Sequence, residues 1–240
     1  MNVRIENGVL MSMRGFSGGE YTTPEGVTKI GAGYALEEYM GPERFIVSEG
    51  VTEIGVNAFF LTGVKTIELP ESLVRICDNA FCCAGITHYI LPDKPIAVGT
   101  QAFYGYNEGG ARVTIRRSEE KGGDLELDIN MGESSWDHTG YHYIMKMIVE
   151  RDFSQKVKPV FKNPIVARMC LAGIPEAEDY VKRGFNRIFK TLCELEDEDT
   201  AARLVRTGRY VTAKNIEKLT DMACGREVIT AALDEVWNNN

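Results

Sequence analysis

Residues 51–59 read VTEIGVNAF, and the same pattern returns as LVRICDNAF at 73–81 and as PIAVGTQAF at 95–103. The three copies align without gaps, so a branched aliphatic residue recurs at 54, 76 and 98, and an Ala-Phe pair recurs at 58–59, 80–81 and 102–103. A fourth, imperfect copy begins with VTKIG at 27–31 and carries extra residues at 37–43. Self-similarity at a fixed period of this length is typical of a solenoid, in which stacked repeats share one core.

Each repeat contains two short strand-like pieces, for example 51–54 and 64–69, separated by the Ala-Phe step and a glycine turn. One repeat cannot bury its apolar face alone, so we expect neighbouring repeats to stack. The rings of Phe59, Phe81 and Phe103 should then form an interior column with the preceding alanines beside them. The amide residues two positions before each phenylalanine are expected to form a ladder that satisfies turn backbone groups: Asn57, Asn79 and Gln101.

The repeats resemble the BspA-like class of leucine-rich repeats, whose units read roughly V-x-x-I-G-x-x-A-F, then a turn and L-x-x-I-x-L-P. Residues 51–59 with 64–70, and 73–81 with 86–92, carry the match. The resemblance covers about residues 3–117, and it implies a bacterial interaction module without catalytic residues. The third repeat lacks a clean Leu-Pro after Phe103 and ends in a final strand at 112–117.

The rest of the chain predicts a helical domain after a connector. The alternating segment 125–129 is expected to be a strand that continues the sheet or caps the solenoid end. Residues 131–162 leave strand and helix open. Helices are expected at 164–171, 176–194, 199–207, 212–224 (with Thr212 as N-cap) and 226–237, and the last pairs are weakly ankyrin-like in length.

The predicted fold class is therefore α+β. It comprises a short β-solenoid of about four repeats, each roughly 22–24 residues long, followed by an α-helical C-terminal domain. The predicted domains are the leucine-rich-repeat solenoid (1–117), a capping strand and irregular inter-domain segment (118–163), and the α-helical domain (164–240).

Charge and cysteine content narrow the functional classes. The 240 residues carry 35 acids and 27 bases for a net charge of −8, which argues against a nucleic-acid binder. No apolar run approaches the roughly 20 residues of a membrane span, and the start MNVRIE lacks the pattern of a signal peptide. The six cysteines form neither a disulfide framework nor spaced CxxC pairs. We therefore expect a cytoplasmic protein, with a secreted or cell-surface adhesin as the alternative.

Three motifs offer chemistry, each with a simpler explanation. Residues 15–19, GFSGG, match the G-x-S-x-G elbow, but no helix is expected after the serine, so a turn is favoured. His138 and His142 have metal-ligand spacing near Trp136, but Thr139-Gly140 disfavours a helix there. The cysteines at 77, 82 and 83 occupy positions where small buried residues suffice. We therefore expect no enzyme, no cofactor and no metal; an enzyme or metal site near Trp136–His142 is the alternative.

The function favoured by the sequence is non-catalytic protein–protein recognition by outward residues of the stacked repeats, with an unknown protein as partner. The repeat register places the candidate partner-binding residues at equivalent outward positions: Glu53 with Arg75, Lys65 with Thr87, Glu68, and a final row of Arg112, Thr114 and Arg116. A basic stripe on the predicted second helix, Arg183, Arg187 and Lys190, is the competing surface, although it is also typical of a solvated helix face.

Overall fold

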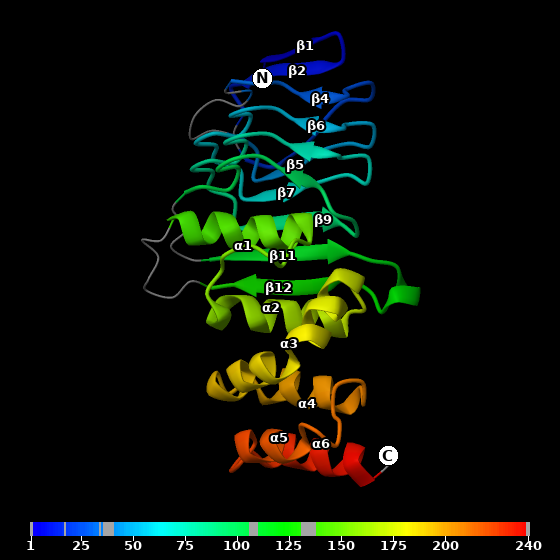
Figure 1. The fold of residues 1–240 in the computed structure, drawn as a ribbon. Helices are drawn as coiled ribbons and strands as arrows, with labels where there is room; N and C mark the ends of the chain where they lie inside the picture. Colours follow the sequence, from blue (N-terminus) through cyan, green and yellow to red (C-terminus); the bar gives the residue numbers. More distant parts are fainter. Residues whose placement is uncertain are drawn as a thin grey trace. The chain divides into compact units, whose positions relative to one another are not determined.

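A computed structural model of the chain describes residues 2–16, 18–33, 35, 41–105, 110–130 and 138–238. The chain divides into two compact units, Met1–Gln155 and Lys156–Asn240 (Figure 1). Within the described residues, the first unit holds every strand and one α-helix, and the second holds the remaining α-helices. Each unit is described by itself below.

The first unit is built from two six-stranded sheets (Figure 1). The first sheet contains, in spatial order, β1 (Asn2–Glu6), β2 (Val9–Arg14), β4 (Lys29–Ile30), β6 (Glu53–Ile54), β8 (Arg75–Ile76) and β10 (Ala97–Val98). The second sheet contains β3 (Glu20–Thr22), β5 (Arg44–Ile46), β7 (Thr66–Glu68), β9 (His88–Pro92), β11 (Ala111–Arg116) and β12 (Leu125–Ile129). From β2 to β11 the chain alternates between the sheets, and like strands pair in parallel. The predicted solenoid is confirmed.

The Ala-Phe pairs fill the space between the sheets, as the repeat pattern predicts. The ring of Phe81 stacks on Phe59 at a centroid distance of 5.2 Å and on Phe103 at 5.5 Å. All three rings and the alanines that precede them are buried. Parallel pairing also superposes Ile54 on Ile76 in the first sheet, so the apolar period of the repeat becomes a continuous core.

The amide position of the repeat has a backbone role. Asn57, Asn79 and Gln101 have φ values of 55°, 54° and 52°, in the left-handed region that most side chains avoid. Their turns stack because the N–H of Asn57 donates to the carbonyl of Asp78 at 3.2 Å, and that of Asn79 to Thr100 at 3.0 Å. Asparagine tolerates this conformation better than other non-glycine residues, which accounts for its recurrence.

Both ends of the solenoid are closed by antiparallel strands. At the beginning, β1 pairs with β2 through a turn at Asn7-Gly8, where both residues have positive φ. At the other end, β12 pairs with β11, so the predicted strand at 125–129 extends the second sheet. Each antiparallel strand pairs the backbone groups that the last parallel strand would otherwise leave open to another chain.

The last turn of the first sheet is covered by α1 (His138–Glu150). In earlier turns, the N–H of each core phenylalanine donates to an alanine carbonyl of the next repeat, as from Phe81 to Ala102 at 2.8 Å. Phe103 has no following repeat, and its N–H donates to Nδ1 of His142 at 3.4 Å. The N–H of Val98 similarly donates to Glu150 at 2.8 Å. The segment left open between strand and helix is therefore a helix, although Thr139-Gly140 disfavours one locally, because burial against the solenoid outweighs local preference.

The second unit consists of five helices within the described residues: α2 (Pro159–Leu171), α3 (Pro175–Glu194), α4 (Glu198–Arg206), α5 (Ile216–Met222) and α6 (Glu227–Asn238). α2 begins at Pro159 and not at Pro164, because Pro159 already supplies the proline suited to a helix start. α5 is preceded by Asn215, so the prediction of Thr212 as N-cap is wrong. The Thr212 N–H instead donates to the Asn215 side chain at 2.7 Å.

Candidate functional site

The outward side of the second sheet carries rows of side chains in fixed register. One row crosses all six strands and consists of Glu20, Arg44, Thr66, His88, Arg112 and Asp128. A second row lies beside it and consists of Thr22, Ile46, Glu68, Ile90, Thr114 and Glu126. Parallel pairing forces this arrangement, because residues one repeat apart must lie on neighbouring strands and on the same side. We call this surface the second-sheet face.

Glu68 is the centre of a charge network on the second-sheet face. Its carboxylate is 2.5 Å from the Arg44 guanidinium and 2.8 Å from that of Arg116. Its side chain is only 13 % exposed, whereas both arginine side chains are nearly half exposed. The carboxylate therefore holds one guanidinium from β5, the strand next to β7, and one from β11, which lies beyond β9 on the other side of β7.

His88, Thr114 and Glu126 form a chain of hydrogen bonds across β9, β11 and β12. The Thr114 hydroxyl donates to Glu126 at 2.7 Å and lies 2.8 Å from Nε2 of His88, which makes that nitrogen the donor. Burial lowers the pKa of His88 and favours the neutral ring. Thr114 is only 6 % exposed. Thr114 lies at the predicted outward register position, in line with Ile90, but it is covered because β12 places Glu126 directly beside it.

Arg112 lies at the rim of a hollow of about 590 Å³ at the end of the second sheet. Its guanidinium is 3.5 Å from Asp128 and 3.8 Å from Glu126, and its side chain is 60 % exposed. The hollow is lined by Thr87, His88, Gly110, Ala111, Arg112, Asp128, Ile129 and Asn130. Lys65 and Thr87 are equivalent positions directly before the neighbouring strands β7 and β9, and both are exposed.

Glu53 and Arg75 lie on the first sheet and not on the second-sheet face. They pair in register on β6 and β8, as predicted, and Glu53 also forms an ion pair with Lys29 of β4 at 2.5 Å. The hydrogen bond from Lys29 is the main cause of the lowered pKa of Glu53. The predicted partner-binding residues therefore divide between two sheets, and one flat partner surface cannot read all of them as a single row.

A second charge cluster, centred on Asp93, connects segments at the end of the solenoid. Asp93, just after β9, is 2.5 Å from Arg151, 2.8 Å from Lys121 and 3.6 Å from Arg117. Asp93, Arg117 and Arg151 are almost entirely covered. Burial of Asp93 opposes its ionisation, but hydrogen bonds from Lys121 and Arg151 hold its pKa below the usual range. The cluster thus ties the last parallel strands to the 3₁₀ turn Glu119–Lys121 and to the segment after α1.

The alternative chemical motifs fall partly outside the described residues. Ser17 of the G-x-S-x-G match, Trp136 and the side chain of His138 lie outside them. His142 is 6 % exposed and already accepts a hydrogen bond from Phe103. Burial, with the nearby Lys146 ammonium, lowers the pKa of His142 to about 4. Within the described part of the chain, no group of three or more His, Cys, Asp or Glu side chains has metal-binding geometry.

Stacked parallel strands around a phenylalanine column, with two sheets fed alternately by one repeat, define a leucine-rich-repeat solenoid. Residues 16–116 match the family model of the BspA type leucine rich repeat region, in six copies. This part of the chain is therefore a BspA-type leucine-rich-repeat region, as the resemblance predicts. No curated protein matches the chain. None of the helices in the described ranges has the length and apolar composition needed to cross a membrane.

Several charged members of the second-sheet face, including Arg44 and His88, are not among the residues predicted from the sequence. The repeat spacing from Thr66 could have identified His88, because both precede the core aromatic or aliphatic residue of their strand. Arg44 follows the stretched first repeat, whose insertion breaks the count. Glu126 and Asp128 belong to an antiparallel strand outside the repeat, where the period gives no signal.

Proposed function

We propose that the chain is a non-catalytic protein–protein interaction module that binds a protein partner through the second-sheet face. The observation that carries the proposal is the row of register-matched side chains that crosses all six strands of this sheet. A rigid solenoid presents such a row without ordering cost on binding, which favours affinity and selectivity. BspA-type repeat regions are typically not enzymatic, in agreement with this proposal.

The second-sheet face supports this role better than the outward side of the first sheet. Its parallel strands are longer, with three to six residues against two in β4, β6, β8 and β10. It also has the hollow beside Arg112, which Thr87 lines as well. Lys65 lies one repeat earlier, at the position equivalent to Thr87. The second-sheet face carries both arginines and acids, so the proposed partner is a protein of mixed charge and not a nucleic acid.

The proposed compartment is the cytoplasm. All six cysteines are free thiols, and Cys77, Cys82, Cys170 and Cys193 are buried without a disulfide partner. Burial of Cys82 beside Cys83 raises its pKa to about 12, which keeps it a protonated, unreactive thiol. Free thiols persist where the surroundings are reducing. Cell fractionation tests this point, and recovery of the protein outside the cell would favour the adhesin alternative.

The experiment that tests the proposed function is affinity capture from native cells with two matched double variants. Lys65→Gln with Arg112→Gln removes two exposed cations from the second-sheet face. Lys29→Gln with Arg75→Gln removes two from the first sheet and gives the same net charge. We expect capture of the partner to fall at least tenfold with the first pair only. Equal capture by all three proteins, each with an unchanged unfolding midpoint, would exclude the second-sheet face.

A further inference from the structure

Two acid-free basic segments occur in the second unit. Residues 180–193 contain four Lys or Arg side chains and no Asp or Glu, and residues 200–216 contain another four and none. In a chain with a net charge of −8, two such segments are a marked local departure. They are separated by the acidic run 194–199, so proximity in sequence alone does not bring them together.

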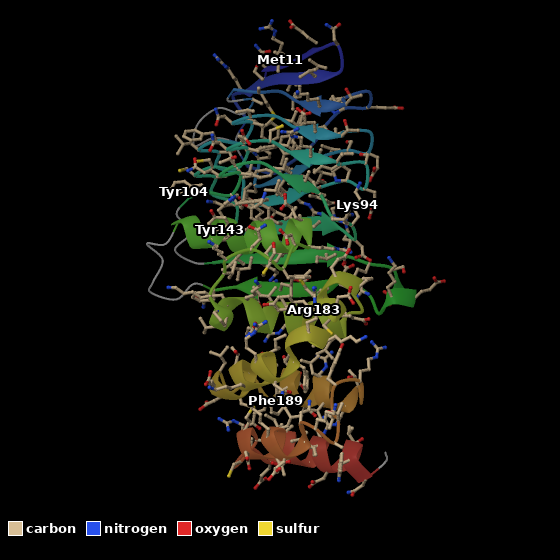
Figure 2. The ribbon with its side chains drawn as sticks, viewed as in Figure 1. Met11, Lys94, Tyr104, Tyr143, Arg183 and Phe189 are labelled. Carbon is tan, nitrogen blue, oxygen red and sulfur yellow. The ribbon has the colours of Figure 1, made fainter. Side chains whose placement is uncertain are left out.

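The fold joins these segments around one hollow. The hollow has a volume of about 680 Å³ and lies between the middle of α3 and the loop that connects α4 to α5. Five cations line it and no acid does: Lys182, Arg183, Arg187, Arg209 and Lys214. Arg183, labelled in Figure 2, lies on the exposed part of α3. Uncompensated like charges facing one space raise the local potential and favour an anionic ligand.

Most of these cations have no carboxylate to neutralise them. Arg209 is 2.8 Å from Glu178, but both side chains are exposed, and such pairs are readily exchanged. Within the described residues, no Asp or Glu carboxylate oxygen lies within 4.0 Å of a charged nitrogen of the other four cations. Nε of Arg183 donates to the backbone carbonyl of Asp179 at 3.2 Å, which leaves its charge without a counter-ion. Lys190, the third member of the predicted helical stripe, differs from them because it pairs with Glu194 at 3.5 Å and does not line the hollow.

The α3 wall of the hollow is preformed by a break in the helix. Gly184 has non-helical dihedral angles inside α3, and a Cβ built there would lie 2.8 Å from Nη2 of Arg187. The missing side chain therefore makes room for the Arg187 guanidinium. That guanidinium is also held by Tyr180, whose hydroxyl accepts from Nη2 at 3.1 Å and whose ring lies 5.6 Å below it.

The loop wall is fixed by the side chain of Asn215. Its Oδ1 accepts from the Thr212 N–H at 2.7 Å, and its Nδ2 donates to Asn186 on α3 at 3.1 Å and to the Tyr210 carbonyl at 2.9 Å. The loop and the helix that carry the cations are thus joined by hydrogen bonds. The two backbone segments that carry these mutually repelling cations are therefore joined before any ligand arrives.

We propose that this hollow binds a small anion with two or more phosphate groups. Planar guanidinium groups match phosphate oxygens in pairs, and ammonium groups add charge, so three arginines with two lysines suit several phosphates at once. The floor offers no aromatic face for a base, because the rings of Phe185 and Tyr210 stack on each other at 5.1 Å and are buried. Recognition therefore rests on the phosphates. This site is independent of the proposed function of the second-sheet face.

The test is isothermal titration calorimetry of the full chain with inorganic tripolyphosphate at 0.15 M salt, with citrate and sulfate as non-phosphate anions. We expect saturable binding of one tripolyphosphate per chain, at least tenfold tighter than either control anion. Arg183→Gln with Lys214→Gln should weaken binding at least tenfold. The matched pair Arg203→Gln with Lys218→Gln, which removes the same charge outside the hollow, should change it less than twofold.

A charge-neutral variant separates a built site from general attraction. Gly184→Ala leaves the net charge unchanged but displaces Arg187, and we expect at least a threefold loss of affinity with no fall in the thermal midpoint. Absence of saturable binding would overturn the proposal. So would equal losses in the two double variants, equal binding of citrate, or an unchanged affinity in Gly184→Ala.

Discussion

The two units differ in the side chains that surround a core residue: equivalent residues of adjacent repeats in the solenoid, and unrelated residues in the helical unit. In the solenoid, Phe81 lies between two equivalent phenylalanines one repeat away on either side. In the helical unit, Phe189 is equally buried but meets different neighbours, such as Phe185 at 5.8 Å. In the regular repeats, the environment of a residue can be predicted from that of the equivalent residue one repeat earlier. The helical unit depends on individual contacts, such as the buried Asn163–Thr191 hydrogen bond at 2.8 Å.

The largest expected loss of stability comes from interrupting the phenylalanine column. Phe81→Ala should lower the free energy of unfolding by about 3–5 kcal/mol, because the ring is buried on all sides and leaves a cavity between two rings that cannot close together. Phe60→Ala, at the half-buried position that follows the equivalent ring Phe59 in the preceding repeat, is the control and should cost clearly less. Denaturant titration measures both. Equal midpoints for Phe81→Ala and the parent would contradict the shared core.

This contrast also explains which parts of the fold the sequence predicts. The repeat period predicts the strands, the column and the equivalence of Glu53 with Arg75. It cannot predict α1, because a cap occurs once and its helix contains Thr139-Gly140, which local preference disfavours. The helices of the second unit are predicted by apolar spacing. The hollow in that unit is not, since it depends on a break at Gly184 and on a loop held by Asn215.

The second prediction concerns the charge cluster at the end of the solenoid. Asp93→Ala should cost about 3 kcal/mol at pH 7, because it leaves Arg151 and Arg117 covered without their common carboxylate. Asp128→Ala, which removes an exposed carboxylate from β12, should cost less than about 1 kcal/mol. Thermal or denaturant unfolding measures both.

The same cluster predicts an acid dependence with a definite sign. The folded-state pKa of Asp93 is depressed, so its contribution is complete above the unfolded value of about 3.9 and is lost as the pH falls through the lower folded value. The stabilities of Asp93→Ala and the parent should therefore converge in strong acid. A constant difference down to pH 2 would show that the contribution is not ionic.

A third prediction tests whether α1 replaces the missing next repeat. His142 must be neutral at Nδ1 to accept from Phe103, and its pKa is lowered to about 4. The unfolded state therefore binds more protons below about pH 6.5, and stability falls from there towards pH 4. Between pH 7.5 and 4.5 the parent should lose about 2 kcal/mol more than His142→Gln. Equal losses in denaturant titrations would refute the role of His142 as acceptor.

On the second-sheet face, too, the residues within the repeats are easier to predict than those at the end of the solenoid. Lys65 and Thr87 are exposed directly before β7 and β9, where the spacing predicts them, and Glu68 lies mostly covered on β7. Thr114 also keeps its predicted register position, but a strand outside the repeat covers it, and the spacing does not predict that burial. The period also could not separate the first sheet from the second, since each repeat contributes one strand to both. Assigning a residue to a face requires the turn between the two strands, which the periodicity does not describe.

The smallest expected effect distinguishes backbone from side chain at the amide position of the repeat. Asn79 has a φ of 54°, which glycine adopts freely and alanine only with strain. If the position is selected for its backbone, Asn79→Ala should cost about 1 kcal/mol and Asn79→Gly close to nothing. A side-chain ladder predicts a different pattern, because both substitutions remove the same amide. Denaturant titration of the two variants decides between these explanations: equal losses would support the ladder, whereas recovery by glycine alone would show that the turn's conformation is what the repeat preserves.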